Sequence, residues 1–219
     1  MALNNSTKNN YLRTFKVLLI LILTIFSISI QSKSLTKEQK LKLRKTSDWL
    51  SKFSIRYAGE FTPPGQNYTL RMDCSNTARF IYEEALGVHL PRTSFDQYNA
   101  VKNSGNLKTP PRSNGKIDTE QLGKILKPGD LLFWINTHSD IPKKWDPPIG
   151  HVMVYLGKNK KSQLVMTGAG TYGKGKRTQK GGIDIYLFDP NAKIGCVRDS
   201  NRKCIKNSEF FGFGKPSLD

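Results

Sequence analysis

The sequence predicts an α+β fold in which N-terminal helices pack on an antiparallel β-sheet. Apolar residues recur three and four positions apart in the first half of the chain, as on one face of a helix. The second half instead carries short apolar runs separated by turns, without helices alternating between them. This order favours an antiparallel sheet over a βαβ arrangement. The length of 219 residues suits one domain, or one domain with an extra subdomain, and is enough for one well-filled core.

Residues 1–32 have the pattern of a secretory signal peptide. A basic segment with Lys8, Arg13 and Lys16 precedes an apolar run of about 14 residues, Val17–Ile30, and small polar residues follow. An uncleaved anchor is the alternative, but a spanning helix needs about 20 apolar residues. We therefore expect export to the periplasm or medium, cleavage between Ser29 and Ser34, and no stable membrane insertion afterwards.

Residues 33–56 form a predicted N-terminal helical segment ahead of a domain at 57–219. Thr36 and Gln39 have the spacing of a capping box, and Trp49, Leu50 and Phe53 then share one face. A loop with Pro63, Pro64 and Gly65 follows.

The next predicted helix begins at the segment Asp73-Cys74-Ser75. Its apolar stripe is Ala78, Ile81, Tyr82, Ala85 and Leu86, and Gly87 ends it. Asp73 and Ser75 are both good capping residues, so Cys74 lies in or just ahead of the first turn.

Five strands are predicted after a loop and short helix in residues 106–126. They are residues 131–135, 149–157, 162–167, 183–188 and 209–215, the last as a C-terminal extension. In the second strand His151, Met153 and Tyr155 share one face.

The chain has three cysteines, Cys74, Cys196 and Cys204, an odd number for an oxidising compartment. Cys196 and Cys204 bracket a short polar loop that a disulfide could close, which would leave Cys74 as the free thiol. No Cys-x-x-Cys or His-x-x-x-His spacing accompanies it, so we expect neither a metal nor another cofactor.

A thiol at a helix N-terminus faces free backbone N–H groups and the positive end of the helix dipole. Both favour the thiolate, so we expect a lowered pKa for Cys74, with an imidazole as its base. Of the three histidines, His89 is expected at the rim and His138 in solvent, whereas His151 is fixed on a strand. A strand-end histidine with no catalytic role is the alternative for His151.

Three segments, in this order and spacing, resemble the NlpC/P60 superfamily of cell-wall cysteine peptidases. They are DCSNTARFIYEEALGVHLPRTSFDQY, LKPGDLLFW and GHVMVYLG, and the resemblance covers roughly Tyr57 to Gly170. It implies a papain-like fold, with Cys74 as nucleophile and His151 as general base. It also implies that Asp73 and Ser75 line the substrate side, where the family grips the free amine of a stem peptide.

Weaker parallels implied by the resemblance place Arg92 and Tyr57 in the substrate site, with ion pairing and core packing as the respective alternatives. The chain departs from the family at Asn76, where a small glycine is usual. It also lacks the third polar residue, often histidine, on the strand after the base. The expected position falls near Met166–Gly168, and Thr167 is its only polar side chain.

Asn136 or Asp140 could replace that third residue from the polar segment before His151. The sequence thus predicts an exported cysteine hydrolase of peptidoglycan stem peptides. An amidase or acyltransferase acting on another amide or ester is one alternative, and an inactive wall-binding protein of the same fold is the other.

The formal net charge of +18 falls by three, to about +15, without residues 1–32. Such a charge suits peptidoglycan or another anionic envelope polymer, although a solvated Lys-rich surface would also account for it. Nucleic acid is not expected, because the aromatic residues do not alternate with basic ones. The glycine-rich segment 168–175 lacks the Ser or Thr of a phosphate-binding loop. The oligomeric state stays open.

Overall fold

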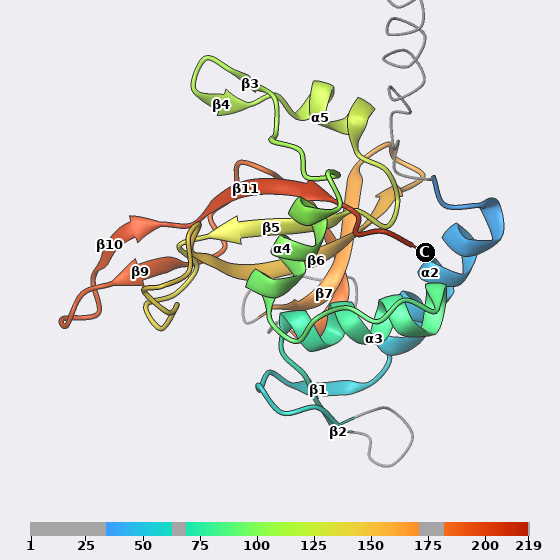
Figure 1. Ribbon diagram of the computed structural model, residues 1–219, viewed down its shortest axis with the longest axis horizontal. Coiled ribbons are helices and arrows are strands. Elements are labelled where there is room, and N and C mark those ends of the chain that lie inside the picture. Colours follow the sequence, from blue (N-terminus) through green and yellow to red (C-terminus); the bar gives the residue numbers. More distant parts are fainter. Residues whose placement is uncertain (1–33, 63–68, 171–181, 219) are drawn as a thin grey trace, which may run out of the picture. The chain divides into compact units, whose positions relative to one another are not determined.

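The computed structural model describes residues 34–62, 69–170 and 182–218 (Figure 1). The chain divides into two compact units, residues 1–31 and 32–219, and only the second contains described residues. The predicted signal peptide, the loop at Pro63–Gly65 and most of the glycine-rich segment 168–175 lie outside them. Within the described part, no helix has the length and apolar character needed to cross a membrane.

The central sheet has five antiparallel strands, which confirms the predicted fold class. They are β5 (Leu131–Ile135), β6 (Ile149–Lys158), β7 (Leu164–Gly170), β8 (Gly182–Leu187) and β11 (Glu209–Gly214). Their order is β11-β5-β6-β7-β8, so the last strand returns to the edge beside β5. The apolar runs recognised in the sequence are these strands.

Four helices occur in the described residues, α2 (Lys37–Leu50), α3 (Cys74–Leu86), α4 (Ser94–Asn103) and α5 (Thr119–Ile125). The predicted capping box of Thr36 and Gln39 is present at the start of α2. Gly87 ends α3 with a φ of 71°, in the left-handed region that glycine tolerates best. Helix α4 was not predicted from the sequence.

Each face of the sheet carries its own apolar cluster. On one face, Val152 and Val154 of β6 pack with Ala78 and Ile81 of α3, and α3 and α4 lie across this face in Figure 1. On the other face, Trp134, Met153, Tyr155 and Met166 pack with Leu122 of α5. The alternation of β6 therefore assigns its residues to two separate environments.

Three short strand pairs complete the unit, and the sequence did not predict them. They are β1 (Ser54–Arg56) with β2 (Thr69–Arg71), β3 (Arg112–Ser113) with β4 (Lys116–Ile117), and β9 (Cys196–Arg198) with β10 (Cys204–Asn207). The segment 33–56 is thus not wholly helical, because β1 occupies its end. A disulfide joins Cys196 to Cys204 across β9 and β10.

Candidate active site

Cys74 is a free thiol in the first turn of α3, directly after the N-cap residue Asp73. It is only 4% exposed. Its sulfur is contacted by the backbone N–H groups of Ser75 and Val152 and by the hydroxyl of Tyr57. Val152 follows His151 on β6, so α3 brings the thiol to the strand that carries the histidine.

The thiol does not have the lowered pKa that its position suggested. Burial raises the pKa of Cys74, because a thiolate loses hydration there, and the charge of Asp73 raises it further. The Tyr57 hydroxyl and the two N–H groups act in the opposite direction but do not outweigh burial. The expectation from the helix N-terminus was therefore wrong in sign, because it omitted desolvation.

His151 lies near the start of β6, opposite Trp134 of β5, and the two rings are 5.8 Å apart between centroids. Pairing of β6 with β7 begins only at Val154, so the two strands are unpaired beside His151. Burial lowers the pKa of His151 to about 4, and nearby His138 also lowers it, whereas Asp73 raises it. Near neutral pH the imidazole is uncharged and able to accept a proton.

Thr167 lies on the opposite face of the sheet from His151. It is paired with Val154, whose side chain packs towards α3, whereas Met166 is paired with Tyr155 on the face of His151. A bulge between Tyr155 and Gly157 sets this register. One extra residue in a strand reverses which side chains share a face. The structure therefore does not bring Thr167 and His151 together, although the sequence had predicted this.

Two methionines occupy the space where a third polar residue was sought. Met153 and Met166 lie on the His151 face. A side chain at Gly168 would place its Cβ 2.4 Å from the sulfur of Met153, so that position cannot contribute a group either. The region where a third polar residue was expected is therefore apolar.

Asp73, Ser75 and Arg92 come together in one hydrogen-bonded cluster. Arg92 donates to Ser75 Oγ at 2.8 Å and to Asp73 Oδ2 at 2.7 Å, and its Nη2 also donates to the carbonyl of Gly59. The other carboxylate oxygen, Asp73 Oδ1, accepts from Ser75 Oγ and from the backbone N–H of Asn76. The cluster is thus pre-ordered around the N-terminus of α3.

Asn76, the departure from the family's usual glycine, is fully buried in this network. Its Nδ2 donates to the Gly59 carbonyl and its Oδ1 accepts from Arg79. Asn76 therefore ties the start of α3 to the segment between β1 and β2.

Tyr57 has its ring partly on the surface, with 38% of the residue exposed, while its hydroxyl end is enclosed beside Cys74. Burial and the neighbouring thiol raise the pKa of Tyr57, so the hydroxyl remains a donor. It was predicted as a substrate residue, and the structure places it against the sulfur.

The other two histidines differ in position. His89 lies beside Glu83 on the surface, with its side chain 80% exposed. His138 is exposed as expected, yet it lines the same pocket as His151, which the sequence did not indicate. A signal was present in Gly150, because a Cβ there would lie 2.3 Å from Thr137 Oγ1, so only glycine allows the segment before His138 to approach His151.

This pocket has a volume of about 770 Å³ and lies on the sheet face opposite α3. Neither Asn136 nor Asp140, the proposed replacements for the third residue, lines it. Among the described residues, no group of three or more His, Cys, Asp or Glu side chains could hold a metal ion.

An antiparallel sheet with a free thiol at the start of a helix packed on it, and a histidine on an inner strand, defines a papain-like α+β domain. The model of the NlpC/P60 family matches residues 56–167, more than half of the chain, and the chain belongs to this family. No curated protein matches the chain.

Among solved structures, the chain is similar to a lipoprotein-like NLP/P60-family protein of Staphylococcus aureus subsp. aureus Mu50. Identity is 17%, and the TM-score is 0.39, over 87% of this chain and 48% of that one. The chain thus spans about half the length of that protein. The family assignment rests on the sequence match alone.

Proposed function

We propose that this protein is an exported cysteine hydrolase that cleaves an amide bond in peptidoglycan stem peptides through Cys74 and His151. The observation that carries the proposal is that the free thiol lies beside the Ser75 and Val152 N–H groups, and Val152 directly follows His151 on β6. The cell-wall peptidase character of the NlpC/P60 family supports the substrate class.

The proposed reaction starts from a neutral pair, not from a thiolate and an imidazolium. As the Cys74 sulfur attacks the carbonyl carbon, its proton passes to His151, and N–H groups at the start of α3 stabilise the oxyanion. His151 then gives the proton to the leaving amine as the C–N bond breaks. Water, deprotonated by His151, releases the acyl group and restores the thiol.

The cluster around Asp73 is suited to a substrate ammonium group. Asp73 Oδ2 accepts one hydrogen bond, from Arg92, and a carboxylate oxygen can accept another. The Cys196–Cys204 disulfide supports export, because such bonds persist in oxidising compartments.

Two observations favour the second candidate, an inactive wall-binding protein of the same fold. The thiol is buried with a raised pKa, and methionines occupy the region of the third polar residue. A related amidase or acyltransferase acting on another amide or ester would use the same pair of residues.

Digestion of purified peptidoglycan and defined muropeptides by the mature protein tests the proposal, with the Cys74→Ala variant as control and mass spectrometry as readout. We expect new fragments from the wild type alone, and their masses identify the bond. Absence of new fragments from both proteins, with wall binding retained by Cys74→Ala, would instead support the binding role.

A further inference from the structure

The pocket lies on the His151 side of the candidate site. His151 and Tyr57 line it, whereas Cys74, Asp73, Ser75 and Arg92 do not. The cluster that suits a substrate amine and the pocket are therefore separate regions, and the thiol with Tyr57 and His151 lies at their junction.

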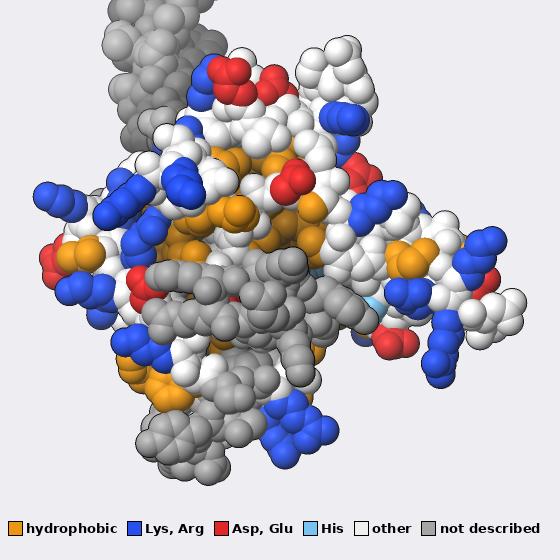
Figure 2. Space-filling view, turned by 180° about the vertical axis from the view of Figure 1, so that it is seen from behind, with side chains coloured by type: hydrophobic (Ala, Val, Ile, Leu, Met, Phe, Trp, Pro, Cys, Tyr) orange, Lys and Arg blue, Asp and Glu red, His pale blue; other side chains and the backbone are white. Residues whose placement is uncertain are grey.

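The floor of the pocket is apolar. Met153, Met166 and Tyr186 line it from β6, β7 and β8, and each is less than 9% exposed. Ile194 adds a fourth apolar side chain. Figure 2 shows the molecule from behind, with hydrophobic side chains gathered above the grey residues and Lys, Arg and some Asp and Glu side chains around them.

The rim of the pocket is basic. Lys193, Arg198 and His138 line it, and among the described lining residues Asp189 is the only acid. Asp189 Oδ1 is engaged by the N–H of Asn191 at 2.9 Å. In the described part of the chain, neither Lys193 nor Arg198 is ion-paired with a carboxylate. Arg198 Nη1 donates to the carbonyl of Arg202 at 2.8 Å, so the remaining N–H groups of Arg198 and the Lys193 ammonium can bind an external anion.

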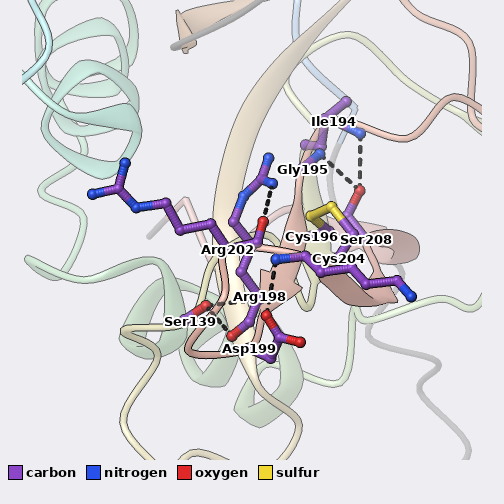
Figure 3. The surroundings of a disulfide bond; sticks show 10 residues. Ser139, Ile194, Gly195, Cys196, Arg198, Asp199, Arg202, Cys204 and Ser208 are labelled. Carbon is purple, nitrogen blue, oxygen red and sulfur yellow. Dashed lines mark hydrogen bonds between the residues drawn. A yellow bond between two sulfur atoms is a disulfide. The ribbon is translucent and has the colours of Figure 1, made fainter.

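The wall that carries Arg198 is held in place before any ligand binds. The disulfide joins β9 to β10, and Ser208 Oγ accepts the N–H groups of Ile194 and Gly195 at 2.8 and 3.1 Å (Figure 3). Ser139 Oγ accepts the Arg198 N–H at 2.8 Å. A fixed wall loses little conformational freedom on binding, which favours a specific ligand.

We propose that this pocket binds the leaving part of the substrate and selects a segment with an apolar side chain and a free carboxylate. The inference rests on the proposed function. The amine released by bond cleavage receives its proton from His151, so the segment that carries this amine must lie on the side of His151 that lines the pocket. Its apolar group fits the methionine floor, and its carboxylate meets Lys193 and Arg198.

Binding to the Cys74→Ala variant tests the pocket without any need for turnover. The probes are the dipeptide Leu-Ala with a free carboxylate, its C-terminal amide, and Gly-Gly. The two chiral probes are prepared from L-residues and from D-residues. Binding is measured by titration calorimetry. We expect the free acid of Leu-Ala to bind at least tenfold more tightly than the amide or Gly-Gly. In the Lys193→Gln/Arg198→Gln double variant, this preference for the acid should disappear.

Lys203→Gln/Lys206→Gln is the matched control, because it removes the same charge from β10 and the adjoining loop outside the pocket lining. Equal binding of acid and amide to Cys74→Ala, or the same loss in both double variants, would overturn the pocket assignment. Hydrolysis of stem peptides without this preference would overturn the inference and leave the proposed function standing. If the pocket binds the free acid selectively but the wild type hydrolyses no stem peptide, the proposed hydrolase function is rejected. The assignment of the pocket to an apolar ligand with a carboxylate then stands.

Discussion

At Cys74, two electrostatic effects oppose each other, and burial is the stronger. The helix N-terminus and the Tyr57 hydroxyl favour the thiolate, while removal of the sulfur from water favours the thiol. His151 is driven by the same burial towards its neutral form. The resting pair is therefore uncharged, and the proton must move when substrate arrives.

The pH dependence of Cys74 alkylation follows from this sign. A raised pKa means that the thiolate fraction is small at neutral pH and grows as pH rises, so we expect the rate with iodoacetamide to increase continuously from pH 6 to pH 10. The guanidinium-unfolded protein, with an ordinary thiol pKa of about 8.5, should react faster below pH 8. A rate that is already high and constant between pH 5 and 7 in the native protein would show a thiolate–imidazolium pair instead.

The positions of Cys74 and His151 could be proposed from the sequence because each is marked by local pattern, a capped helix start and an alternating strand. The third position could not. Extending the hairpin register of Gly157 with Val165 would pair Tyr155 with Thr167 and place Thr167 on the His151 face. The bulge beside Gly157, whose φ is 98°, changes the pairing to Tyr155 with Met166, and a single glycine in a strand does not fix which residue is left unpaired.

Thr167→Val tests this assignment at a single atom. Among the described residues, the buried Thr167 hydroxyl has no hydrogen-bonding partner, so its replacement by a methyl group of similar size removes an unsatisfied polar atom. We expect the free energy of unfolding in urea to rise by about 1 kcal/mol, with kcat unchanged. Val165→Ala is the control for core packing on the same strand. A tenfold fall in kcat for Thr167→Val with unchanged stability would show that Thr167 takes part in catalysis.

At the scale of elements, periodicity predicted the helices and strands that bury an apolar stripe. Helix α4 escaped because most of its residues are polar and its apolar contacts depend on three side chains, Phe95, Tyr98 and Val101. Its importance appears only in three dimensions, where Gln97 donates to the carbonyl of Ser75 at 3.0 Å. Helix α4 thus supports the first turn of α3 from a distance of some twenty residues in sequence.

The hairpin of β9 and β10 depends on its disulfide more than the central sheet does. Closing a loop of this length contributes on the order of 2–3 kcal/mol by restricting the unfolded chain. We expect Cys196→Ser/Cys204→Ser to accelerate amide hydrogen exchange throughout residues 196–207, with exchange in β5, β6 and β7 almost unchanged. Reduction of Cys74→Ala with dithiothreitol should reproduce the effect without altering the catalytic thiol. Equal protection with and without the disulfide would show that Ser139 and Ser208 suffice to hold this wall.

At the scale of the whole molecule, the family and the fold were predictable because the chain contains three motifs in a characteristic order and spacing. The different roles of the two sheet faces could not be predicted, because they depend on strand pairing over the full sheet. One face supports the thiol through α3, and the other forms the pocket behind His151.

A net charge of +18, or about +15 without residues 1–32, should attract the protein to anionic wall polymers before any specific contact forms. Because the Debye length shrinks from about 10 Å at 0.1 M salt to about 3 Å at 1 M, this attraction is screened as salt rises. We expect retention of the Cys74→Ala variant on isolated cell walls, measured by sedimentation, to fall several-fold between 0.1 and 1 M NaCl. Retention that is insensitive to salt would assign wall binding to local contacts, and the excess of lysines would then be a solvated surface with no role in attachment.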